Sequence, residues 1–194
     1  EDCKTSTERE EALLRLLTPI SKLYSAKACI ASASEHIEMF GGLGYLEDTN
    51  IPVLLRNAQV LSIWEGTTNV LSLDMLRAIE KENGLVAYKE FAEEMIASIS
   101  LPELQEAKNI LSNKLKSLYR FIGNISSKDT MIGCSRDIAF FIGELTIGLL
   151  WMDFIQKEKK KKYFKALNYW IKFKMNENSL DLYEMMIAEH ESVS

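Results

Sequence analysis

The sequence predicts an all-α fold, and three observations lead to that prediction. Apolar residues recur mainly at intervals of three and four positions, which is the spacing of amphipathic helices. Only three prolines punctuate the 194 residues. The composition, 47% apolar and 26% charged, is that of a soluble globular chain that can bury a core of packed helices.

The first predicted helix runs from Glu8 to about Phe40. We expect a break or kink at Thr18-Pro19, because threonine can cap a helix and proline suits the first turn of a new one. The glycine cluster Gly41-Gly42-Leu43-Gly44-Tyr45 should end this first helical stretch, since glycines in a helix interior cost backbone entropy.

The rest of the chain is also predicted to be helical. A shorter segment, Val53 to Ile63, precedes a helix that Thr67 or Thr68 can cap and that runs to Ile79. The polar turn Lys81-Glu82-Asn83-Gly84 is the best candidate boundary, and it divides the chain into two regions, 1–80 and 85–194. The second region should hold helices at Leu85 to Ile99, Glu103 to Ile122, Thr130 to Lys157, Lys160 to Lys174 and Leu180 to Glu189.

Charge and cysteine content narrow the classes of function. A net charge of -5 argues against a protein whose main surface binds nucleic acid. Three widely spaced cysteines, Cys3, Cys29 and Cys134, favour reduced thiols inside a cell over a disulfide framework. The apolar stretch Ile138 to Ile155 contains two acids and is interpreted as a buried helix rather than a membrane span. The chain begins with Glu and shows no leader, so we expect a processed piece or a fragment.

The heptapeptide Ile63-Trp64-Glu65-Gly66-Thr67-Thr68-Asn69 places a lone carboxylate just before a predicted helix. Such a carboxylate can simply interact favourably with the helix dipole and accept hydrogen bonds from the free amides of the first turn. Alternatively, Glu65 would lose hydration beside an aromatic residue and could serve as a general base. The glycine cluster is likewise either a helix cap and turn or a close approach to a phosphate. His36 and His190 lie far apart and no Cys/His spacing is present, so no metal site is expected.

Two motifs in order resemble a known family. Glu38 to Ile79, "EMFGGLGYLEDTNIPVLLRNAQVLSIWEGTTNVLSLDMLRAI", carries a Gly-Gly-x-Gly-Tyr turn, an Arg-Asn-Ala helix and then Ile-Trp-Glu-Gly-Thr before a last helix. It is similar to the C-terminal helical domain of the acyl-CoA dehydrogenase flavoproteins, and the resemblance extends from Thr18 to Ile79. It implies that residues 1–80 are part of that family's four-helix bundle and that 85–194 are an additional helical region.

The resemblance implies roles for individual residues. Glu65 falls at the position of the family's catalytic base, which removes the α-proton of a fatty acyl-CoA while the β-hydrogen leaves as hydride to FAD, giving a 2,3-enoyl-CoA. Trp64 and Gly66 would form the wall beside the substrate and the flavin. Thr67 and Asn69 would contact the FAD. The turn with Gly41, Gly42 and Gly44 would pack against the FAD of a neighbouring subunit.

The resemblance also implies what surrounds this chain. The family's upstream domains hold most of the FAD and acyl-CoA, so the fragment alone would be inactive. The parent would be an oxidoreductase of fatty acid metabolism that forms a homodimer or homotetramer and passes electrons to a further acceptor. It would act inside the cell, in the mitochondria of a eukaryote and otherwise in the cytoplasm.

A second interpretation rests on Leu16 to Lys27, "LLTPISKLYSAK", which together with Trp64 and Asn69 looks more like the AidB branch of the family. These alkylation-response flavoproteins keep FAD, but their dehydrogenase activity is weak or doubtful. The chain would then be a non-enzymatic module whose basic aromatic helix 156–174 binds DNA or anionic lipid. A solvated helix end is the plainer alternative. The lysines concerned are Lys159, Lys160, Lys161 and Lys162.

Overall fold

The structure is a computed structural model that describes residues 6–175, and the fold of that part is all-α, as predicted. The helix predicted at Leu180 to Glu189 lies outside the described residues. The elements, with η marking short 3-10 helices, are α1 (Glu8–Met39), α2 (Gly42–Tyr45), η1 (Glu47–Thr49), α3 (Ile51–Leu61), α4 (Thr68–Lys81), α5 (Gly84–Ser98), η2 (Pro102–Leu104), α6 (Gln105–Asn124), α7 (Lys128–Glu158) and α8 (Lys161–Lys174).

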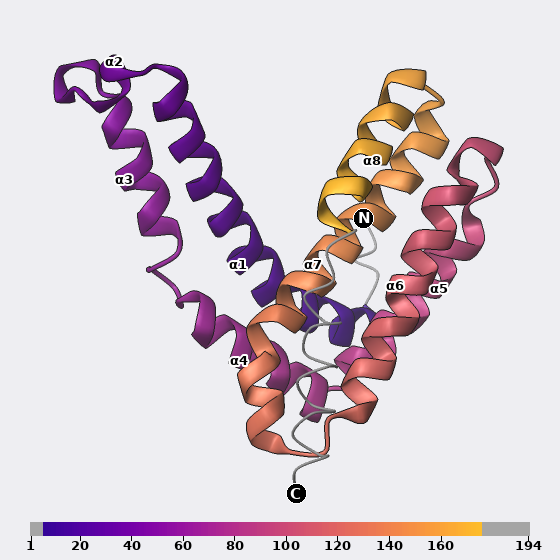
Figure 1. The fold of residues 1–194 in the computed structure, drawn as a ribbon. Helices are drawn as coiled ribbons and strands as arrows, with labels where there is room; N and C mark the ends of the chain where they lie inside the picture. The colour runs from indigo at the N-terminus through magenta and orange to yellow at the C-terminus, as the bar shows by residue number, and fades with distance from the viewer. Residues whose placement is uncertain (1–5, 176–194) are drawn as a thin grey trace, which may run out of the picture.

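The helices form two arms that diverge from a common base (Figure 1). The hairpin arm, residues 24–61, consists of the C-terminal half of α1, the turn α2 and the antiparallel α3. The bundle arm consists of α5, α6, α7 and α8. Helix α4 lies at the base, where it packs against both α1 and α7 and so joins the two arms.

One hydrophobic core runs through the base and the bundle arm. Its fully buried side chains come from both sides of the predicted boundary at 81–84, which is the turn between α4 and α5. The division into two domains stays a prediction, but the two regions share this core. Members from α1, α4, α5, α6 and α7 include Leu16, Ile20, Met75, Tyr88, Leu118, Ile142 and Leu145.

Helix α1 runs continuously through Pro19, so the predicted break at Thr18-Pro19 is wrong as a helix boundary. The Thr18 hydroxyl donates to the carbonyl oxygen of Leu14 at 2.7 Å instead of capping a new helix. Pro19 and Ile20 are buried against neighbouring helices. This packing offsets the helical hydrogen bond that proline cannot make.

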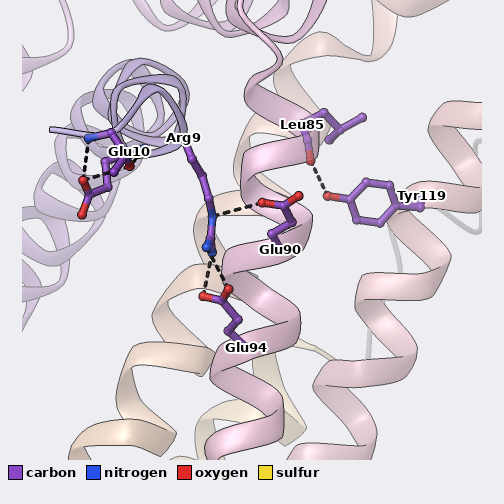
Figure 2. A network of polar contacts seen from close by, with 7 residues as sticks. Arg9, Glu10, Leu85, Glu90, Glu94 and Tyr119 are labelled. Carbon is purple, nitrogen blue, oxygen red and sulfur yellow. Dashed lines mark hydrogen bonds and ion pairs between the residues drawn. The ribbon is translucent and has the colours of Figure 1, made fainter.

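Polar contacts fasten the start of α1 to the bundle arm (Figure 2). The Arg9 guanidinium donates to both carboxylate oxygens of Glu94 at 2.7 and 2.8 Å and lies 3.2 Å from Glu90. Hydrogen bonding to Arg9 lowers the pKa of Glu94. The Tyr119 hydroxyl donates to the Leu85 carbonyl at 2.8 Å and links α6 to α5. The ion pairs are exposed, so they orient α1 more than they stabilise it.

Among the described helices, α7 is long and apolar enough to cross a membrane by length and composition. In this fold, 56% of its most apolar window is buried, against α1, α4, α5 and α6. The burial supports the interpretation of Ile138 to Ile155 as a core helix.

Candidate functional site

The glycine cluster ends α1, as predicted, and then turns back through α2. Gly41 has a φ of +55°, which is open to glycine but costly for most other residues. Gly44 is buried, and a Cβ there would overlap the carbonyl oxygen of Ile37, so only glycine lets the turn lie against α1. A Cβ on Gly42 would meet nothing within 4 Å. The cap-and-turn interpretation therefore has a direct structural basis.

The heptapeptide forms the connection between α3 and α4 and has an unusual backbone. Glu65 has a φ of +55° and Gly66 a φ of +107°. Glutamate is not among the residues that favour the left-handed region, and holding it there costs about 1–3 kcal/mol. Gly66 also packs closely, because a Cβ there would lie 3.2 Å from the side chain of Leu71. The surroundings must therefore hold this connection in place.

The contact that holds it comes from α1. The ammonium nitrogen Nζ of Lys22 donates to the carbonyl oxygen of Trp64 at 2.7 Å and to that of Gly66 at 2.5 Å. These two carbonyls lie on either side of Glu65 in the chain. Sequence reasoning missed Lys22, although it lies in the segment Leu16 to Lys27 that was singled out for its resemblance.

Glu65 lies at the edge of a groove of about 590 Å³ between α1, α4 and the heptapeptide. Arg15 crosses the groove and donates to both oxygens of Asp74 at 2.7 and 2.8 Å, with Glu82 at 3.3 Å. Hydrogen bonding by Arg15 lowers the pKa of Asp74. Glu11, also in the groove, accepts from Ser6 at 2.6 Å. Within the described residues, Glu65 is the one groove carboxylate without a hydrogen-bond or ion-pair partner.

Within this chain the residues around Glu65 do not enclose it, and the expected enclosure by apolar walls stays a prediction. Glu65 is exposed, Trp64 is 53% exposed and Ile63 is 63% exposed.

The residues implied to contact FAD fall into two groups. Gly41, Gly42 and Gly44 lie at the tip of the hairpin arm, whereas Thr67 and Asn69 lie beside Glu65 at the start of α4. Helix α3 separates the groups by its 11 residues, about 16 Å of helix. Thr67 is the N-cap residue of α4, as predicted, with extended backbone but without a side-chain capping bond. The roles of all five residues stay predictions.

The basic segment 156–174 is not one helix, which corrects its description as a single basic helix and agrees with the predicted helices that end at Lys157 and begin at Lys160. Helix α7 ends at Glu158, Lys159 has a φ of +53° and α8 begins at Lys161. Lys160 pairs with Glu158 at 3.2 Å, so the charge at the turn is partly neutralised. Lys162 lies 4.9 Å from the centre of the Tyr163 ring.

In the part of the chain that the structure describes, no group of three or more His, Cys, Asp and Glu side chains could hold a metal ion. Cys29 is an exposed free thiol and Cys134 a buried one. Burial raises the pKa of Cys134. Cys3 and His190 lie outside the described residues.

Comparison with known proteins agrees with the motifs. Residues 4–80 match the model of the acyl-CoA dehydrogenase C-terminal domain. The chain is 42% identical over 156 residues to acyl-CoA dehydrogenase family member 11 of Caenorhabditis elegans, covering 76% of this chain and 25% of that protein. It is 40% identical over 79 residues to the putative acyl-CoA dehydrogenase AidB of Escherichia coli, covering 40% of this chain and 15% of AidB.

A solved structure extends the likeness beyond the motif region. The crystal structure of Caenorhabditis elegans ACDH-11 in complex with C11-CoA has a TM-score of 0.82 and 35% identity, and the match covers 97% of this chain and 34% of that one. Residues 4–80 are therefore a C-terminal domain of the acyl-CoA dehydrogenase family, and the likeness in fold extends over nearly the whole chain. It spans about a quarter of the length of the C. elegans family member 11.

Proposed function

We propose that this chain is the C-terminal segment of an FAD-dependent acyl-CoA dehydrogenase in which Glu65 removes the α-proton of a fatty acyl-CoA. One observation carries the proposal. Within the described residues, Glu65 is the groove carboxylate without a partner, and it lies on a backbone of positive φ inside the family-matched segment. A base must be accessible and must not have its lone pairs occupied by structural bonds, and Glu65 meets both conditions.

The residues around Glu65 fit a flavin and a thioester on its open side. Thr67 and Asn69 are exposed at the N-terminal end of α4, where a hydroxyl, an amide and free backbone N–H groups can hold a polar cofactor. FAD, when bound, would accept the β-hydrogen as hydride while the α-proton goes to the Glu65 carboxylate. Trp64, half exposed beside Glu65, would cover the reacting carbons and exclude water.

Further features of the parent are part of the proposal. The C11-CoA in the related structure supports an acyl-CoA as the substrate. Apolar side chains exposed on the hairpin arm, including Phe40, Leu43, Tyr45 and Leu54, support contacts with more protein, as in a homodimer or homotetramer. The proposal also includes an electron acceptor for the flavin and an intracellular site, mitochondrial in a eukaryote and otherwise cytoplasmic.

The test uses the full-length protein that contains this segment. The protein is purified with its flavin and mixed anaerobically with saturated acyl-CoAs of increasing chain length. At least one acyl-CoA should remove the absorbance of the oxidised flavin. The matching 2,3-enoyl-CoAs serve as controls, because their Cα–Cβ bond is already oxidised to a double bond. A flavin that no saturated acyl-CoA reduces would contradict the dehydrogenase assignment.

A second function is proposed for the outward face of α8, because that helix contains no acidic residue. The exposed Tyr169 and Phe173 rings pack against each other at 4.3 Å between centroids, beside exposed Lys165 and Lys172. Lysines interleaved with exposed aromatics suit an anionic lipid surface or DNA.

Replacing Lys162, Lys165 and Lys172 with Gln should weaken binding to anionic vesicles or to DNA in a salt-dependent way. The matched control replaces Lys81, Lys89 and Lys108 with Gln. Equal affinity of both triple variants and the wild type would mean that the α8 lysines are only a solvated face.

A further inference from the structure

The connection that carries Glu65 depends on one side chain from another helix. Lys22 lies on α1, one helical turn after Pro19, and both residues line the same groove as Glu65. Its two hydrogen bonds, at 2.7 and 2.5 Å, go to main-chain carbonyls rather than to the groove's carboxylates. The charged group of Lys22 therefore binds the backbone of the heptapeptide.

The bonded pair of carbonyls restricts the backbone of Glu65 and Gly66 together. Fixing the oxygens of Trp64 and Gly66 to one ammonium group fixes the peptide plane before Glu65 and the peptide plane after Gly66, and so limits the combined φ and ψ angles of these two residues. A carbonyl pair without this donor would turn toward water, and Glu65 would relax from its φ of +55°. Charge-assisted hydrogen bonds are about twice as strong as neutral ones, which suits a group that must offset backbone strain.

We propose that Lys22 is a positioning residue, which holds the Trp64 and Gly66 carbonyls so that the Glu65 carboxylate faces its substrate. It acts through the backbone and does not itself transfer the proton. This inference rests on the proposed function in one respect only, namely that Glu65 is the base. The geometric part, that Lys22 holds the connection, is independent of any activity.

Hydrogen exchange reports the geometric part directly. The amides of Ile63 and Trp64 both donate to Val60, at 2.9 and 3.1 Å, so their exchange reports opening of this connection. In the full-length protein with its flavin, Lys22→Met keeps the aliphatic stem but removes the donors. The exchange rate at these amides should rise about tenfold or more, because the connection loses the stabilisation that a hydrogen bond to a charged group supplies.

Two variants separate this role from general destabilisation. Lys22→Arg keeps two donors on one charged group and should restore near-wild-type exchange. Lys27→Met removes a lysine from the same helix, five positions on, and should leave the connection unchanged. Exchange in α6 and α7 and the flavin content should match the wild type in all three variants.

Kinetics test the consequence for the base. Lys22→Met should lower kcat about tenfold or more with little change in KM, because the substrate still binds while the base is misplaced. Lys22→Arg should recover most of kcat. A merely structural role would not give a loss confined to kcat and rescued by arginine.

The outcomes are distinct. Equal exchange of the Ile63 and Trp64 amides in Lys22→Met and wild type overturns the proposal. Faster exchange with unchanged kcat overturns the positioning role. If no acyl-CoA reduces the flavin of the wild-type protein, the proposed function is contradicted instead. The exchange data then still decide whether Lys22 holds the connection.

Discussion

In the bundle arm the large apolar side chains are buried, whereas in the hairpin arm many lie on the surface. Leu118 of α6 and Ile142 of α7 are fully buried, but Leu54 of α3 is 61% exposed and Tyr45 at the tip is 83% exposed. Both arms show the same helical spacing of apolar residues. Spacing alone therefore does not say whether a face packs within this chain or against other protein.

The two arms also differ in what they contribute to stability and to the candidate site. Stability comes from burial, so the bundle arm and the base should supply most of it. The family motifs lie in the hairpin arm and in the connection that follows it, where apolar surface is exposed and the backbone is strained. Many exposed apolar side chains in one part of a protein mark an interaction site more often than a defect.

The largest difference should appear between two equivalent leucine truncations. Leu118→Ala should lower the free energy of unfolding of this chain by about 2–5 kcal/mol, because it leaves a cavity in the core. Leu54→Ala, on an exposed face of α3, should change it by less than about 0.5 kcal/mol. Urea unfolding followed by circular dichroism measures both. Similar losses for the two variants would abolish the contrast between the arms.

A glycine pair tests the hairpin arm itself. Gly44→Ala should cost about 1–3 kcal/mol, since the new Cβ overlaps the Ile37 carbonyl and the turn must shift. Gly42→Ala has open space and should be close to neutral. The readout is amide exchange at Gly41 and Gly44, whose N–H groups donate to Glu38 and Gly41. Equal exchange in both variants would mean that the close packing at Gly44 does not hold the tip.

The smallest expected effect concerns the ion pair that joins α1 to α4. Arg15 lowers the pKa of Asp74 in the folded state, so this carboxylate contributes stability above its unfolded pKa and loses it as pH falls through the lowered value. Asp74→Asn should therefore cost under about 1 kcal/mol at neutral pH, and the difference from wild type should vanish in strong acid.

A pH series of urea unfolding curves tests this, with Glu80→Gln on the exposed face of α4 as control. If the difference in free energy of unfolding between Asp74→Asn and wild type grew as pH fell, the contact with Arg15 would not be its cause.

Much of the fold was predictable because helical spacing and turn chemistry are local. The end of α1 at the glycine cluster and the cap at Thr67 follow from backbone freedom and capping, which the sequence displays directly. The break at Thr18-Pro19 was wrong because burial of Pro19 is a tertiary effect.

The candidate site was less predictable, for two physical reasons. Enclosure depends on tertiary packing, and within this chain both Glu65 and the neighbouring Trp64 are exposed. Lys22 binds carbonyl oxygens, which every residue has, so no sequence pattern identifies its partners. The turn between α7 and α8 was predictable, because the spacing ends one helix at Lys157 and begins the next at Lys160, although the positive φ of Lys159 leaves no mark in a run of lysines.

The central claim is that the connection between α3 and α4 presents Glu65 as the catalytic base. Its most direct test is the rate of anaerobic flavin reduction by a substrate acyl-CoA in full-length Glu65→Gln, with Glu82→Gln from the same groove as control. Glu65→Gln should keep its flavin and fold but reduce it at least about 10²-fold more slowly, while Glu82→Gln should stay close to wild type. Equal rates in Glu65→Gln and wild type would contradict the claim, and Glu65 would then be only the carboxylate that precedes α4.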